Sequence, residues 1–319
     1  MLPDLDRFAG VLLGGALGDA LGRPAEGSHR TTVEPQLPLR FAGRHPGGIT
    51  DDTEQTILVA ESLLARGGVD AEDIAARLVA WLPHGTGKGS ATKCAVRRLT
   101  EGVPWYLAGE DSAGNGAAMR AAPIGLWRHA DPWRLRRDAT VLALPTHRSP
   151  TAVAAAVAYA SAIGHLVQAD PASFAQGGLV EAMTRSIACM EPVPLRERRD
   201  PTSFTTLRDR LAEVPDLLPL SADEALLRRL WSGAFVVESL PAALYCFLRS
   251  PHDFDLAVAT AIAAGHDTDT VASFVGGMFG ALHGRQALPQ ELVAGLAERE
   301  RLEYLAEALF AARRAQAAR

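Results

Sequence analysis

Glycine recurs at every fourth position near the start of the chain. The segment LDRFAGVLLGGALGDALG contains Gly10, Gly14, Gly18 and Gly22. In a helix this spacing places the four glycines on one face, which becomes a ridge without side chains. Each glycine destabilises a helix interior by about 0.5–1 kcal/mol relative to alanine. We therefore expect close packing against another backbone, or a site, to offset the loss.

A second segment, ASFVGGMFGALHG, has the same spacing at Gly276, Gly280 and Gly284. Most of the remaining chain also has helical periodicity, and convincing alternating strands are nearly absent. Helical patterns cover residues 71–82, 151–168, 235–248, 256–265 and 291–310. The sequence therefore predicts an all-α fold, built as a single domain over residues 1–319.

Two segments are irregular. Residues 24–48 are rich in Pro and Gly and connect the first helix to an acidic segment. A connection of about 25 residues is long for a compact domain, which favours a functional loop or lid over a surface loop without a role. Residues 191–222 are rich in Pro and charge and are predicted to form a surface excursion.

Composition excludes some classes of protein. The 319 residues are 48% hydrophobic and 22% charged, which is typical of a globular core, and the net charge of −5 is not that of a nonspecific nucleic-acid binder. We expect no nucleic-acid partner, unless a nucleic acid carries the chemical group on which the protein acts. One local basic patch, for which a solvated helix face is the favoured interpretation, consists of Arg128, Arg134, Arg136 and Arg137.

The cysteines and the N-terminus indicate the compartment. The three cysteines are widely spaced, so they form neither a disulfide framework nor a metal motif. Asp4 and Asp6 stand where an export signal needs positive charge. The apolar run at residues 151–167 is mostly Ala and too weakly hydrophobic to span a bilayer, so a buried helix explains it better. We expect a cytoplasmic protein without membrane attachment.

Acidic and hydroxyl side chains crowd into the segment ITDDT, residues 49–53. An apolar helical pattern follows, and Asp51 with Glu54 has the spacing of a capping box. An acidic helix N-terminus is also favoured by the helix dipole. A cap explains one acid and one hydroxyl, but not four successive oxygen-bearing residues.

The segment GHDTDT, residues 265–270, has the same architecture before another apolar helix. If both helix starts converge, their four carboxylates would repel one another unless a cation lay between them. Carboxylate and hydroxyl oxygens suit Mg²⁺, Mn²⁺ or Ca²⁺ rather than Zn²⁺. The two segments together therefore predict a cation site.

Further polar residues surround these segments in the sequence. Asp19 is either a structural hydrogen-bonding group or a site residue, and Pro24 is expected to end the first helix, so that Glu26 lies on the exit loop. The turn at Gly114–Gly116 is either ordinary or an anion cradle of backbone N–H groups. Arg120 would neutralise an anion or pair with an acid, and His147 precedes the Ala-rich helix.

Five segments in this order resemble the ADP-ribosylglycohydrolase family. They are GGALGDALGRPAE, ITDDT, GNGAAMRAAP, THRSP and GHDTDT, and the resemblance runs from about residue 8 to residue 285. The chain is most similar to bacterial enzymes that resemble dinitrogenase reductase-activating glycohydrolase. The resemblance implies an all-α domain with two divalent cations, Mg²⁺ or Mn²⁺, at the base of a cleft.

The resemblance also implies roles for individual residues. The expected metal ligands are Thr50, Asp51, Asp52, Asp267, Asp269 and Thr270. Expected catalytic residues are Glu26, which matches a family acid near the metals, Asp52, and Asp111, which lies near a position assigned to an acid in some bacterial members. Expected substrate contacts are Asp51, Gly114, Asn115, Gly116, Met119, Arg120, His147, Phe235 and His266.

Two of these residues need comment. Phe235 falls where the family often has an aromatic ring near adenine. His266 stands where many members have Gly, and it is expected to alter access to the metals or to contact the leaving group.

The resemblance implies hydrolysis of the glycosidic bond between ADP-ribose and an acceptor, with arginine-linked protein favoured. Alternatives are serine-linked ADP-ribose, O-acetyl-ADP-ribose and ADP-ribose on nucleic acid. A noncatalytic ADP-ribose binder or a structural member, similar to certain lens crystallins, is a second class of alternative, and an unrelated metal-dependent phosphohydrolase is a third. We expect a monomer.

Overall fold

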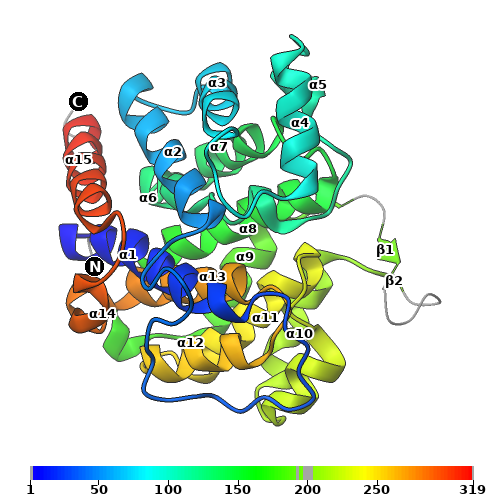
Figure 1. Ribbon diagram of the computed structural model, residues 1–319, viewed down its shortest axis with the longest axis vertical. Coiled ribbons are helices and arrows are strands. Elements are labelled where there is room, and N and C mark those ends of the chain that lie inside the picture. The colour runs from blue at the N-terminus through cyan, green and yellow to red at the C-terminus, as the bar shows by residue number, and fades with distance from the viewer. Residues whose placement is uncertain (1–2, 192–193, 197–203, 318–319) are drawn as a thin grey trace.

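A computed structural model describes residues 3–191, 194–196 and 204–317, and it confirms the predicted all-α fold (Figure 1). In the first half of the chain the helices are α1 (Leu5–Gly22), α2 (Asp51–Arg66), α3 (Ala71–Trp81), α4 (Ser90–Thr100), α5 (Trp105–Ala108), α6 (Ala122–Arg128), α7 (Pro132–Ala143) and α8 (Pro150–Leu166). In the second half they are α9 (Gln176–Ser186), α10 (Leu207–Leu217), α11 (Val236–Arg249), α12 (Phe254–Ala263), α13 (Thr268–His283), α14 (Gln290–Ala294) and α15 (Arg299–Ala317).

Shorter elements connect these helices. The 3₁₀ turns are η1 (Arg23–Ala25), η2 (Asn115–Ala117), η3 (Pro171–Ser173) and η5 (Arg285–Ala287), and η4 (Asp223–Leu230) is π-helical. The strands β1 (Leu195–Arg196) and β2 (Phe204–Thr205) form a two-residue antiparallel pair.

The predicted surface excursion at residues 191–222 lies partly outside the described residues. Its described part includes α10, whose Leu207, Leu211 and Val214 are fully buried. That part of the prediction is wrong, because the apolar face of α10 belongs to the core.

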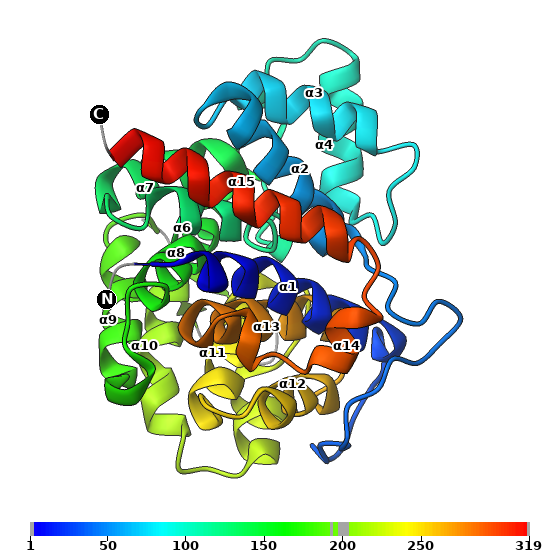
Figure 2. The same ribbon diagram turned by 90° about the vertical axis from the view of Figure 1, so that its left-hand side faces the viewer.

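The two glycine ridges pack against each other, which confirms the close backbone approach predicted from their spacing. Figure 2 shows α1 lying along α13. Gly10 faces Gly280 and Gly14 faces Gly276, and a Cβ atom added at any of these four positions would lie closer than 3.0 Å to the carbonyl of the glycine opposite. Real Cβ atoms are essentially never that close, so only glycine fits here. We call this contact the glycine seam.

The direction of the seam determines what meets at its end. Residue numbers fall along α13 as they rise along α1, so the helices are antiparallel and the C-terminal end of α1 meets the N-terminal end of α13. There the Thr268 hydroxyl donates a hydrogen bond to the carbonyl oxygen of Gly22 at 2.7 Å. The seam therefore places the GHDTDT segment beside the exit from α1.

Asp19 attaches the start of α2 to the same place. Its buried carboxylate accepts hydrogen bonds from the backbone N–H groups of Thr50 (2.9 Å) and Thr53 (3.2 Å) and from the Thr53 hydroxyl (2.5 Å). These groups are donors that the first turn of a helix cannot satisfy internally. Of the two roles considered for Asp19, structural hydrogen bonding is the one observed.

The start of α2 is not a capping box. Thr50 is the N-cap, and its hydroxyl accepts a hydrogen bond from the N–H of Asp52 at 3.4 Å. The Glu54 carboxylate instead accepts hydrogen bonds from the Trp81 indole (2.8 Å) and the Thr86 backbone N–H (3.0 Å). The acids of ITDDT are therefore not all used in capping the helix.

The Ala-rich helix α8 runs through the middle of the molecule and is buried along nearly its whole length, as predicted (Figure 1). Among the described residues, no helix combines the length and apolar character needed to cross a membrane. Pro24 lies in η1, so α1 ends before Glu26, also as predicted. The irregular segment that follows lies against α12.

Candidate active site

The exit from α1 and the starts of α2 and α13 surround a cavity of about 210 Å³, the acidic cavity. Its walls combine carboxylates with a glycine-containing turn. It is lined by Glu26, Asp51, Asp52, Gly87, Gly89, Ser90, Ala91, Thr92, Ser112, Gly114, Asn115, Gly116, Met119, His147, Ala234, Asp267, Asp269 and Thr270.

Most residues that the sequence singled out lie on this cavity. Those that line it are Glu26, Asp51, Asp52, Gly114, Asn115, Gly116, Met119, His147, Asp267, Asp269 and Thr270. Thr50 lies behind them as the buried N-cap of α2. The lining does not include Asp111, Arg120, Phe235 or His266.

Hydroxyl and amide groups donate hydrogen bonds to the acids, but they do not satisfy every buried carboxylate oxygen. Oδ2 of Asp52 accepts from the hydroxyls of Thr270 (3.3 Å) and Thr50 (3.4 Å). Oδ1 of Asp52 is buried and has no hydrogen-bond partner among the described residues. Opposite, the Asn115 amide donates to Asp267 at 2.6 Å. A buried carboxylate oxygen without a partner is costly, so the cavity has unused capacity to bind a positive group.

The carboxylates oppose one another electrostatically. Burial, and then the nearby charge of Asp19, raises the pKa of Asp51 to about 8. Burial also raises the pKa values of Asp52 and Asp269 well above their ordinary range, with the neighbouring acids adding to the shift. Among the described residues, no Lys or Arg side chain lines the cavity. The negative charge therefore requires protons or a bound cation.

This donor set fits hard divalent cations. No group of three Asp, Glu, His or Cys side chains in the described part of the chain is arranged to hold a metal ion. Mg²⁺, however, is usually bound through one or two carboxylates and completes its shell with water. The carboxylates at the starts of α2 and α13, with the hydroxyls of Thr50 and Thr270, supply such oxygens from two sides.

The turn at residues 114–116 forms the opposite wall, packed on a neutral histidine. The Asn115 N–H donates to the carbonyl oxygen of Ala234 at 3.1 Å, which joins the turn to the start of α11. A Cβ added at Gly116 would lie 3.0 Å from the His147 ring, so this position has little room for a side chain. Burial lowers the pKa of His147 to about 3, so its imidazole is neutral at physiological pH.

Arg120 lies behind this wall and not on the cavity surface. Its side chain is fully buried behind the wall and is not in contact with the cavity. The guanidinium donates to the Gln55 amide oxygen (2.7 Å), the Gly116 carbonyl (3.1 Å) and the Thr146 hydroxyl (2.5 Å). It therefore supports the turn and the segment before His147, and a contact between Arg120 and the substrate stays a prediction.

Two further predictions find no support in the lining. Asp111 is exposed and its neighbour Ser112 lines the cavity, so a catalytic role for Asp111 stays a prediction. Phe235 is half-buried, and its backbone pairs with Gly114 as an isolated bridge. A contact between Phe235 and adenine stays a prediction.

His266 is adjacent to the cavity through its backbone. Its φ is +61°, in the left-handed region that glycine adopts most readily. Its N–H donates to the Ser28 carbonyl, and its own carbonyl accepts from the Gly27 N–H, both at 2.7 Å. Its ring lies edge-on to those of His29 (5.0 Å) and Trp231 (5.1 Å). His266 thus ties the segment after Glu26 to the segment before Asp267.

Sequence reasoning missed one wall of the cavity. The segment HGTGKGS, residues 84–90, leads into α4 and contributes Gly87, Gly89 and Ser90. Gly87 has a φ of +63°, and a Cβ there would collide with the Asp51 carboxylate. Alternating glycines before a helix N-terminus are a recognisable pattern for a backbone that closely approaches a ligand.

The chain is similar to known proteins in sequence and in fold. The family model described as ADP-ribosylglycohydrolase matches residues 1–319. The chain is 26% identical to ADP-ribosylarginine hydrolase Tri1 of Serratia proteamaculans, over 96% of this chain and 79% of that protein. It is 29% identical to ADP-ribosylhydrolase ARH3 of Mus musculus, over 96% and 91% respectively.

A solved structure titled "ADP-ribosylglycohydrolase-related protein complex" superposes with a TM-score of 0.78 at 30% identity, covering 97% of this chain and 98% of that one. The chain therefore belongs to the ADP-ribosylglycohydrolase family. By this membership it is a glycohydrolase enzyme.

Proposed function

We propose that this enzyme uses divalent cations to hydrolyse the bond between the anomeric carbon of ADP-ribose and an acceptor, with arginine side chains of proteins as the preferred acceptor. The observation that carries the proposal is the uncompensated acidic cavity, where four carboxylates from two helix starts face a glycine turn. Bound cations would orient ribose hydroxyls and lower the pKa of a water molecule.

The chain's own residues hold and orient the reactants. The turn at residues 114–116 and the neutral imidazole of His147 form a wall for the ADP-ribose half, which Arg120 supports from behind. Thr50 and Thr270 orient the Asp52 carboxylate, and Asn115 orients Asp267.

Glu26 is the proposed proton carrier. It lies at the exposed mouth of the cavity, where partial burial and then the nearby Asp267 raise the pKa of its carboxyl group. A carboxyl group with a raised pKa exchanges protons at near-neutral pH more readily than an ordinary one. We assign to Glu26 the transfer of a proton to the leaving group or from the attacking water.

Two observations support an arginine acceptor. The acidic mouth of the cavity attracts a cationic leaving group. Beside it, the rings of His29, His266 and Trp231 form an aromatic cluster, which suits a guanidinium through cation–π contact. The name of the relative Tri1, ADP-ribosylarginine hydrolase, also specifies arginine, whereas the name ADP-ribosylhydrolase ARH3 specifies no linkage.

The test is the release of ADP-ribose from an arginine-ADP-ribosylated protein by the wild type, Asp52→Asn and Asp269→Asn. We expect both variants to lose activity, since each removes a cation ligand. Near-normal turnover in both would contradict the cation site. A panel with serine-linked ADP-ribose and O-acetyl-ADP-ribose then tests the acceptor, and a higher kcat/KM for either one than for the arginine linkage would overturn that preference.

A further inference from the structure

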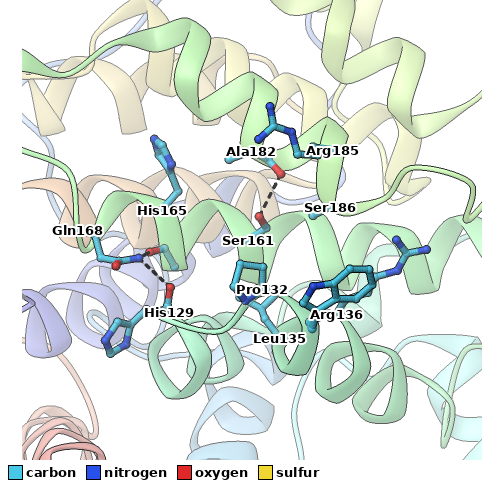
Figure 3. Close-up of a pocket in the computed structure, with 12 residues that line it drawn as sticks. His129, Pro132, Leu135, Arg136, Ser161, His165, Gln168, Ala182, Arg185 and Ser186 are labelled. Carbon is cyan, nitrogen blue, oxygen red and sulfur yellow. Dashed lines mark hydrogen bonds between the residues drawn. The ribbon is translucent and has the colours of Figure 1, made fainter. Parts of the chain in front are cut away.

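A second cavity, of about 430 Å³, lies between α7, α8 and α9 and shares no lining residue with the acidic cavity. Figure 3 shows its side chains, with Arg136 from α7, Ser161 and His165 from α8, and Arg185 from α9. We call it the α7–α9 cavity. It is lined by His129, Pro132, Trp133, Leu135, Arg136, Ser161, Gly164, His165, Gln168, Ala182, Arg185 and Ser186.

The four arginines of the basic patch found in the sequence differ in their ionic partners, and one of the four lines this cavity. Arg128 and Arg137 both pair with Asp138, at 2.6 and 2.7 Å, and Arg134 pairs with Asp131 at 3.4 Å. The solvated-face interpretation thus holds for the exposed Arg134 and Arg137, but not for Arg128, whose side chain is largely buried against Asp138. Arg136 differs, because within the described residues it forms no salt bridge and its guanidinium donates only to the Ala188 carbonyl, at 3.1 Å. An unbalanced cation therefore lies on the cavity wall.

The rest of the lining adds no opposing charge. Within the part of the chain that the structure describes, no Asp or Glu side chain lines the α7–α9 cavity, and the second cation, Arg185, is paired with Glu181 outside it. Burial lowers the pKa values of His129 and His165, so both rings are neutral at physiological pH. The electrostatic character of the cavity therefore comes from Arg136 and favours one negative charge in a ligand.

The remaining surface is apolar and aromatic. Trp133 is 82% exposed although it lines the cavity, so its indole has a face available for stacking. Pro132 and the buried Leu135 continue this surface. Exposed indoles are enriched where proteins contact ligands, because the ring combines a large apolar area with specific stacking geometry.

From these features we propose that the α7–α9 cavity binds a small molecule that combines a flat aromatic ring with one anionic group. The ring lies against Trp133 and the anion pairs with Arg136. The volume falls within the range of about 300–1,000 Å³ typical of small-molecule sites. The site is independent of the proposed hydrolysis, because α8 contributes its C-terminal half here, whereas His147 precedes its N-terminus.

The test is calorimetric titration with indole-3-acetate, which has both features. Indole and acetate, which each have one, are the chemical controls. We expect saturable one-to-one binding of indole-3-acetate, and binding at least about tenfold weaker for either control, because each lacks the stacking ring or the charge-assisted hydrogen bond. Adenosine 5′-monophosphate tests phosphate in place of carboxylate.

Variants locate the site. Arg136→Ala and Trp133→Ala are each expected to weaken indole-3-acetate binding about tenfold. Arg134→Ala is the matched control, since it removes an acid-paired arginine from the same helix, and its affinity is expected to stay within about threefold of the wild type. Asp269→Asn in the acidic cavity is expected to leave binding unchanged.

Each contrary result has a defined meaning. Absence of saturable binding by the wild type overturns the proposal. So does binding that Arg136→Ala and Trp133→Ala leave intact, or that Asp269→Asn abolishes. Thermal unfolding of each variant confirms that it is folded, and unchanged release of ADP-ribose by the α7–α9 variants shows that the two cavities act separately.

Discussion

The helices α1 and α13 make two very different regions. Along the glycine seam they meet backbone to backbone, with Gly10 and Gly14 against Gly280 and Gly276. Beyond the end of the seam, the exit from α1 and the start of α13 help to frame a cavity lined by carboxylates with raised pKa values. There a buried oxygen of Asp52 lacks a hydrogen-bond partner among the described residues.

The comparison separates seam residues, whose packing stabilises the folded state, from cavity residues, whose like charges are expected to destabilise it. In the seam, any added atom disrupts packing, so substitutions are expected to cost stability. At the proposed cation site in the cavity, like charges held together are expected to destabilise the protein until a cation binds, so neutral substitutions are expected to add stability and remove function. Such opposing effects are typical of functional sites.

The largest expected effect is in the seam. Gly14→Ala places a methyl group against the carbonyl of Gly276, and backbone cannot move aside as a side chain can. We expect a loss of about 3 kcal/mol or more in the free energy of unfolding. Gly177→Ala in α9 is the control, because nothing lies within 4 Å of the added atom, and it is expected to gain about 0.5 kcal/mol. Equal stability of both variants in urea unfolding would contradict the seam.

The second prediction concerns Asp269 in the cavity, where a substitution is expected to lower activity and to raise stability. Asp269→Asn is expected to lower ADP-ribose release on the order of 100-fold or more, because a cation ligand is lost. In EDTA the same variant is expected to unfold at a higher temperature than the wild type, because a neutral amide removes repulsion among buried carboxylates. A lower unfolding temperature in EDTA would show that the carboxylates are not strained.

The third prediction is the pH dependence of the metal-free protein. Burial raises the pKa of Asp51 from 3.8 to about 8, so its proton is held more tightly in the folded state. The contribution of the Asp51 proton to the free energy of unfolding is fully present below pH 3.8 and is lost as the pH rises through 8. Its size is a few kcal/mol at most. We expect stability in EDTA to fall between pH 5 and 8 less steeply in Asp51→Asn than in the wild type. Identical slopes of stability against pH for the two proteins would contradict the raised pKa of Asp51.

The smallest expected effect is at His266. Asn also tolerates a left-handed backbone, so His266→Asn keeps the turn at φ +61° but removes the ring that contacts His29 and Trp231. We expect the preference for arginine-linked over O-acetyl-linked ADP-ribose to fall by a few fold, as loss of a cation–π contact implies. An unchanged ratio of kcat/KM values would remove the aromatic cluster from acceptor recognition.

Local patterns predicted much of this structure. Glycines at steps of four predicted the seam, and the crowded oxygens of ITDDT and GHDTDT predicted the two helix starts that meet in the cavity. Both are properties of short segments, since periodicity and an excess of acids beyond what a cap uses are visible without a partner. The family resemblance supplied the remaining site residues.

Other features depend on partners that are distant in the sequence. Arg120 looked available for an anion, but its two terminal nitrogens donate to Gln55 and Thr146, and only the fold brings these partners together. Glu54 had capping-box spacing but bonds to Trp81 on the next helix. Arg136 is distinguished from Arg134 only by which acids lie near in space. The glycines of residues 84–90, by contrast, form a local pattern before a helix, so this wall of the cavity could have been predicted from the sequence.

The central claim is that the carboxylates at the seam's end are two halves of one cation site. It is tested most directly by titrating the metal-free wild type with Mn²⁺ in a calorimeter, with Asp52→Asn alongside. We expect two bound ions for the wild type and the loss of at least one in the variant. A wild type that binds neither Mn²⁺ nor Mg²⁺, or a variant that binds Mn²⁺ as the wild type does, would contradict it.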